Sequence, residues 1–246
     1  MKMANRNTNY LVFISFLLFS SKFLIAQQNF INVPSCEVTL KKKIFLQQQI
    51  NINNITQSNS TIDYGLGNSY EIGLNILGVN FNNKNAILEN DSVNCEPYYP
   101  LVLINGLKQF EINKKSSVSI GAQLGYNFTN YIENNNASMA YINYRIKDLL
   151  IKNAAFVFGT FYNSLHYGGS GNRIGFWAAT EIPLNNYLHA MAETIIGPNA
   201  ISYSSTGLIY YPVKWMPLTF GIQVPNNANS NASFVFELTI LPITKK

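Results

Sequence analysis

One stretch near the middle of the chain, residues 118–128, alternates apolar side chains with small or polar ones without interruption. Ile120 and Leu124 fall on one face, and Gln123 and Asn127 fall on the other. Period two indicates a strand, because successive side chains point to opposite faces of the pleat. A transmembrane barrel strand has this pattern, with its apolar face toward lipid. A half-buried strand of a soluble sheet has it too, so recurrence along the chain decides between the two.

The alternation recurs from residue 44 almost to the end of the chain. Each segment is close to the roughly nine to eleven residues that a tilted strand needs to cross a bilayer. The 12 predicted strands cover residues 44–52, 60–66, 70–81, 98–112, 118–128, 138–146, 154–165, 173–184, 187–196, 204–213, 217–224 and 233–241. We therefore predict an all-β fold: a closed, antiparallel, up-and-down transmembrane β-barrel of about 12 strands.

The connections between these strands alternate in length. Every second connection is short, and the others are mostly longer and rich in Asn, Gly and Ser. Short periplasmic turns and longer outward loops are typical of outer-membrane barrels. The longer set comprises residues 82–97, 129–137, 166–172 and 225–232. Only 12% of the residues are charged, against about 25% in soluble domains, which indicates that much of the surface does not face water.

The ends of the chain differ from the repeating part. Residues 1–26 resemble a secretory signal peptide, with Lys2 and Arg6 before an apolar stretch and the small residue Ala26 at the expected cleavage site. A membrane anchor is disfavoured because that stretch is shorter than the roughly 20 residues of a spanning helix. We assign residues 27–43 to a periplasmic lead-in or a plug of the lumen, residues 44–242 to the barrel, and residues 243–246 to a C-terminal tail.

Three short segments resemble hairpins of small porin-like or transporter-like outer-membrane β-barrel proteins. They are Ser-Asn-Ser-Thr-Ile-Asp-Tyr-Gly-Leu-Gly at 58–67, Tyr-Glu-Ile-Gly-Leu-Asn at 70–75, and Tyr-Tyr-Pro-Val-Lys-Trp-Met-Pro-Leu at 210–218. The resemblance implies an outer-membrane location, contact with outer-membrane lipid, and insertion by the barrel-assembly machinery. Proteins of this kind usually end on an aromatic residue, whereas the last aromatic residue here is Phe236.

Several polar and charged residues fall on the faces that we assign to the lumen. Rings of carboxylates select cations, so these residues form either a cation-favouring constriction or hydrogen-bonded networks that line a polar interior. The spacing of the acids does not indicate a hydrolytic pair, and we predict no enzyme activity. The predicted pore-lining residues are Asp63, Glu71, Glu111, Gln123, Arg145, Glu181, Glu193, Gln223 and Glu237.

Metal, cofactor and nucleic-acid sites are not expected. The chain has two histidines and two cysteines, without the spacing of a metal site, and His189 fits a satisfied interior histidine. Without residues 1–26 the chain has 14 basic and 12 acidic residues, so there is no strongly basic patch for nucleic acid. Cys36 and Cys95 are either free thiols or a disulfide, and a disulfide requires the N-terminal segment to thread the lumen.

The pattern predicts a narrow channel or passive transporter for small polar solutes or cations. The alternative function is a closed structural barrel that binds a partner through its outward loops. A soluble secreted β-sandwich would need fewer apolar aromatic side chains on its outer surface. The sequence does not identify the solute.

Overall fold

The structure of this protein is a computed structural model that describes residues 30–54, 56–81, 86–87, 100–128, 135–226 and 231–243. The predicted signal peptide, the end of the predicted C-terminal tail, and Cys95 lie outside the described residues.

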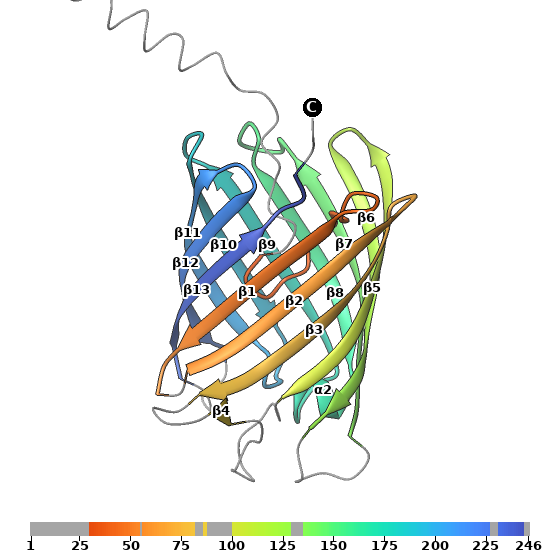
Figure 1. Cartoon of the computed structure of the whole chain (residues 1–246), viewed down its shortest axis with the longest axis vertical. Helices are drawn as coiled ribbons and strands as arrows, with labels where there is room; N and C mark the ends of the chain where they lie inside the picture. The colour runs from red at the N-terminus through yellow and green to blue at the C-terminus, as the bar shows by residue number, and fades with distance from the viewer. Residues whose placement is uncertain are drawn as a thin grey trace, which may run out of the picture.

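Twelve long antiparallel strands form a single closed sheet in the described part of the chain (Figure 1). A two-residue strand, β4, pairs with the end of β3, and a four-residue helix, α2, follows β8. The elements are β1 (Ile44–Ile52), β2 (Thr56–Gly67), β3 (Tyr70–Phe81), β4 (Ala86–Ile87), β5 (Leu101–Asn113), β6 (Ser116–Asn127), β7 (Asn136–Lys147), β8 (Ala155–Asn163), α2 (Leu165–Gly168), β9 (Ile174–Pro183), β10 (Leu188–Ile196), β11 (Tyr203–Val213), β12 (Met216–Pro225) and β13 (Ser233–Ile240).

The first and last strands close the barrel, as predicted. Gln47 of β1 pairs with Thr239 of β13 on one side and with Thr61 of β2 on the other. All other long strands pair with their sequence neighbours, so the topology is up-and-down. Closure matters because a backbone in hydrocarbon must satisfy every N–H and C=O internally. The predicted fold class is confirmed.

The predicted strand bounds are correct within a few residues, with one larger difference at β2. The alternation predicted a start at Ser60, but β2 begins at Thr56, which pairs with Ile52 and with Phe81. These additional residues are polar, so the sequence gives no apolar alternation there. The strand continues because its neighbours on both sides extend as far.

Side chains alternate between the inside and the outside of the barrel. In β6, Ser119 and Asn127 are fully buried, whereas Ile120 and Leu124 are 49% and 62% exposed. The faces therefore have the predicted orientation, with the apolar one outward. A soluble protein rarely exposes so continuous an apolar surface. The barrel is built to contact lipid.

Exposed aromatic side chains gather near the two ends of the barrel. We call the end where β1 begins and β13 ends the terminal end, and the opposite end, with α2 and β4, the loop end (Figure 1). Such girdles mark the two interfaces of a transmembrane barrel. The terminal-end group is Tyr64, Tyr70, Phe110, Tyr144, Tyr187, Tyr210 and Trp215, and the loop-end group is Phe81, Tyr126, Phe128, Tyr162, Phe176 and Phe234.

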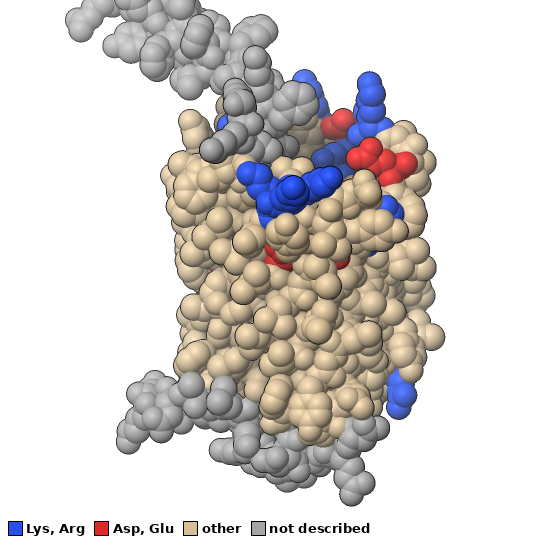
Figure 2. Space-filling model, turned by 45° about the vertical axis from the view of Figure 1, so that its right-hand side comes forward, with Lys and Arg blue, Asp and Glu red and all other residues tan. Residues whose placement is uncertain are grey.

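Basic side chains gather at the terminal end. Figure 2 shows most of the Lys and Arg side chains of the face it draws at that end, above a broad surface with few charged groups. Lys108 fits an interface position, because its ammonium lies 3.9 Å from the centroid of the Tyr70 ring and donates to the Asn68 carbonyl at 2.5 Å. A long side chain of this kind keeps its charge near water while its stem covers apolar surface. None of the helices in the described ranges is long and apolar enough to span a membrane.

The outward apolar belt makes a depth-dependent prediction. Ile142 lies at the centre of β7 and is 50% exposed, whereas Ile112 lies next to the last residue of β5 and is 60% exposed. An arginine at the bilayer midplane costs about 2–4 kcal/mol, and about 0–1 kcal/mol near an interface. We expect Ile142→Arg to lower the free energy of unfolding from lipid vesicles, measured in a urea titration, by about 2–4 kcal/mol. Ile112→Arg is the matched control, and equal effects of both variants would contradict the assigned membrane position.

Candidate functional site: the lumen and its N-terminal segment

Residues 30–43, the N-terminal segment, run inside the barrel before β1 begins. Phe30, Ile31 and Val33 are buried, and they belong to one hydrophobic cluster with inward side chains such as Leu103 and Val157. Cys36 is also fully buried. The described start of this segment is therefore enclosed by the barrel wall.

The carboxylate of Glu193 holds the start of this segment. The backbone N–H groups of Asn32 and Val33 donate to it at 3.0 and 3.1 Å. The Asn32 amide donates to the same carboxylate at 2.8 Å and to Gln223 at 2.9 Å. Hydrogen bonds to a charged group are about twice as strong as neutral ones. Glu193, predicted from the sequence as a pore-lining acid, is thus an anchor for the polypeptide backbone.

A side chain on β7 fixes the next residue of the segment. Asn143 donates to the Pro34 carbonyl at 2.6 Å and accepts a hydrogen bond from the Trp177 indole at 2.5 Å. Gly159, opposite on β8, leaves the space for this pair, because a Cβ there would overlap both the Asn143 amide and the Trp177 indole. The glycine is required by the close approach of these side chains.

Charged contacts hold the rest of the segment near the terminal end. Glu37 forms ion pairs with Arg145 and, at 3.0 Å, with Lys147. The Thr39 backbone N–H donates to the Glu71 carboxylate at 2.5 Å. Arg145 and Glu71, both predicted to line a pore, are therefore committed to contacts with residues 37–39.

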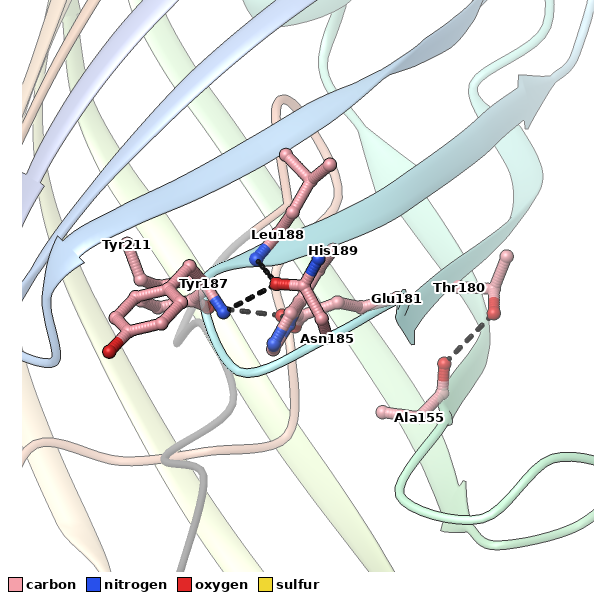
Figure 3. A network of polar contacts seen from close by, with 8 residues as sticks. All are labelled: Ala155, Thr180, Glu181, Asn185, Tyr187, Leu188, His189 and Tyr211. Carbon is pink, nitrogen blue, oxygen red and sulfur yellow. Dashed lines mark hydrogen bonds and ion pairs between the residues drawn. The ribbon is translucent and has the colours of Figure 1, made fainter. Parts of the chain in front are cut away.

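Glu181 belongs to a separate buried network on three adjacent strands. Its carboxylate lies 2.5 Å from His189 Nδ1 and accepts a hydrogen bond from the Tyr211 hydroxyl at 3.0 Å. Figure 3 shows these side chains of β9, β10 and β11 converging. His189 is therefore an interior histidine, as predicted, with a carboxylate partner at Nδ1, but its buried Nε2 has no hydrogen-bond partner among the described residues.

The remaining predicted residues occupy different surroundings. Asp63 accepts from the Asn105 amide at 2.9 Å, and Gln123 accepts from the Tyr167 hydroxyl at 2.9 Å. Glu237 is fully buried near the Thr219 hydroxyl. Glu111 is exposed near the terminal end of β5, because its strand continues there beyond the buried part of the lumen. The inward acids do not gather into one ring.

A cavity of about 790 Å³ occupies the lumen between the N-terminal segment and the loop end. Phe30 and Pro34 form part of its wall on one side, and Asn53 and Tyr203 line it near the loop end. Amide side chains are frequent in its lining, and Asp63 and Glu71 are the charged residues there. The described lumen is thus partly filled by the N-terminal segment and partly hollow.

The Cys36 thiol is unreactive in this setting. Burial raises its pKa above the ordinary value, although the nearby Ser119 and Ser117 and the charge of Arg145 oppose the shift. The thiolate is the reactive form. Cys36 has no disulfide in the structure, and its predicted alternative partner lies outside the described residues. Among the described residues, no group of His, Cys, Asp and Glu could hold a metal ion.

The partners of the inward acids could not be identified from the sequence. Alternation places Glu193 and Glu71 on the inner face, but it does not indicate that a backbone segment more than 30 residues away fills the space between them. The absence of alternation in residues 30–43 carried the only signal, since a segment with buried apolar residues and no strand period needs another surface to cover it.

Solved outer-membrane porins share this fold. The KdgM porin has a TM-score of 0.58 at 10% identity, and the match covers 80% of this chain and 98% of that chain. The KdgM porin in complex with disordered oligogalacturonate has a TM-score of 0.54 at 8% identity, covering 82% and 99%. The NanC porin has a TM-score of 0.52 at 8% identity, covering 82% and 100%.

The closed 12-strand barrel and its outward apolar belt define the fold class of this chain, a transmembrane β-barrel similar in fold to these porins. This agrees with the predicted outer-membrane location. No protein-family model matches the sequence, and no curated protein matches it either.

The anchoring of the N-terminal segment predicts a change in thiol reactivity. Glu193→Ala removes the acceptor of the Asn32 and Val33 N–H groups, so the segment should leave the lumen more often and expose Cys36. We expect maleimide labelling of folded protein, in a Cys95→Ser background, to accelerate at least about tenfold, because three hydrogen bonds to the carboxylate are lost and each contributes about 1.5 kcal/mol. Urea-unfolded protein provides the fully reactive control. An unchanged rate would contradict the anchoring role of Glu193.

Proposed function

We propose that this protein is an outer-membrane channel for small polar solutes, exported by a signal peptide at residues 1–26 and inserted by the barrel-assembly machinery. The single observation that carries the proposal is the cavity of about 790 Å³ in the lumen of a porin-type barrel. The N-terminal segment forms the constriction on the terminal-end side of that cavity. Passage requires this segment to shift or leave.

Uncharged solutes fit the lumen better than ions of either sign. Among the described inward residues, the bases Arg145 and Lys147 are paired with Glu37, so little positive charge remains for an anion. Glu71 and Glu193 accept backbone hydrogen bonds, so they are engaged in holding the segment. One fold neighbour was solved in complex with oligogalacturonate, which carries carboxylates. The described part of this lumen offers no excess of basic groups for such a ligand.

The alternative function, a closed structural barrel, has support from the same segment. Phe30, Ile31 and Val33 are buried in a hydrophobic cluster inside the barrel, and a lumen filled in this way would block ion flow while it stays filled. The two functions differ in whether the segment is displaced under working conditions. Conductance separates them.

Breaking the anchor should open the channel. We expect the purified, folded wild-type protein to give small, infrequent openings in a planar bilayer, because the segment occupies part of the lumen. Glu193→Ala should raise the open probability at least about tenfold, because the segment loses three hydrogen bonds to the carboxylate. Single-channel recording measures both quantities.

The matched control is Asp148→Ala, which removes an exposed carboxylate in the turn after β7 that pairs with Lys115. It should leave the openings unchanged. If the wild-type protein and Glu193→Ala are both silent, although both are shown to be folded, the channel proposal fails and the structural barrel stands.

A further inference from the structure

The cavity at the loop end has two chemically different walls. One wall comes from β1–β3 and β5 and is rich in amides, among them Gln49, Asn51, Asn75 and Asn105. The facing strands β7, β9 and β10 contribute apolar and aromatic side chains: Met139, Tyr141, Trp177 and Ile195. The order of strands around the closed sheet sets these two walls opposite each other.

The amide wall can bind a ligand with several hydroxyl groups. Each Asn or Gln side chain presents both a donor and an acceptor, which is what a hydroxyl group needs. Neighbouring amides already hold one another in place: Gln49 donates to Asn51 at 2.8 Å, and Asn105 donates to Asn75 at 3.1 Å. The wall is therefore an ordered array of polar groups, which reduces the entropy lost on binding.

The facing wall is apolar and rigid. Trp177 stacks on Phe161 with ring centroids 4.7 Å apart and meets the Tyr141 ring edge-to-face at 5.6 Å. The indole N–H is used by Asn143, so the part of the Trp177 ring that lines the cavity is apolar. An apolar lining with a few placed polar groups is typical of small-molecule sites of about 300–1,000 Å³, and the volume here lies within that range.

The charges of the cavity exclude an acidic ligand. Its charged lining residues in the described chain, Asp63 and Glu71, are carboxylates. Asp63 is hydrogen-bonded to Asn105, and Glu71 to the Thr39 backbone, so they are engaged by the protein itself. A negatively charged ligand would find no basic group among the described lining residues to balance its charge, whereas an uncharged ligand needs none.

We propose that this cavity binds a short neutral saccharide, with the hydroxyl edge of a sugar ring on the amide wall and its C–H face toward the apolar wall. This inference rests on the proposed channel function, because it identifies the class of solute that the channel would carry. The binding site itself depends only on the cavity. It differs in ligand charge from the oligogalacturonate complex of the neighbouring porin.

Tryptophan fluorescence of the full-length folded protein tests the proposal. The chain has two tryptophans, and Trp215→Phe leaves Trp177, which lines the cavity, as the only reporter. We expect saturable changes in emission with maltotriose or cellotriose, and none with a galacturonate trimer. A saturable response to the acidic trimer, or no response to either neutral trisaccharide, would overturn the proposal.

A pair of adjacent residues supplies matched variants. Gln49 lines the cavity, whereas Gln48 bonds to Ser58 and Ser60 and does not line it. In the Trp215→Phe background, Gln49→Leu should weaken saccharide binding about tenfold, as expected when a buried polar contact is lost, and Gln48→Leu should leave it unchanged. Equal losses in both variants would place the ligand elsewhere and overturn the inference. Heat-modifiable migration in gels checks that both variants fold.

The two proposals fail separately. Openings of Glu193→Ala without saccharide binding would reject the neutral-saccharide site and leave the channel. Saccharide binding to a protein whose variants are all silent would reject the channel and leave the site.

Discussion

The structure depends on one constraint: a backbone in hydrocarbon must satisfy all its polar groups internally. An open sheet has two edges with unpaired N–H and C=O groups, each costing several kcal/mol in lipid. The pairing of β1 with β13 removes both edges. The outward side chains are apolar because they face hydrocarbon, and the alternation of the strands places the polar side chains inward. Closure therefore fixes both surfaces of the barrel.

Closure also creates a problem that residues 30–43 solve. A ring of this size encloses an interior in which carboxylates such as Glu71 and Glu193 are buried, and a buried charge without partners is costly. Backbone N–H groups of the N-terminal segment supply those partners. The apolar residues Phe30 and Val33 fill the space between them. The acids then hold the segment in position, while the segment supplies hydrogen-bond partners to the acids.

The sequence predicted the fold better than it predicted the site. Alternation is a local signal, so the strands, their number and the outward direction of Ile120 and Leu124 could be read from it. Whether the lumen is hollow or filled depends on contacts between residues far apart, such as Asn32 with Glu193, and period two carries no information about them. Glu111 illustrates the same limit, because alternation gives its face and not its depth along the barrel.

The covalent link between the segment and β1 decides how the lumen can work. A segment that leaves the lumen stays tethered at Ile44, so its effective concentration remains in the millimolar range typical of short linkers. Return is therefore fast, and weak individual contacts suffice to keep the lumen filled most of the time. The contacts are also spread over Glu193, Asn143 and Arg145 on different strands. A solute in the cavity meets Phe30 and Pro34 directly, so the residues that form the constriction also lie within its reach.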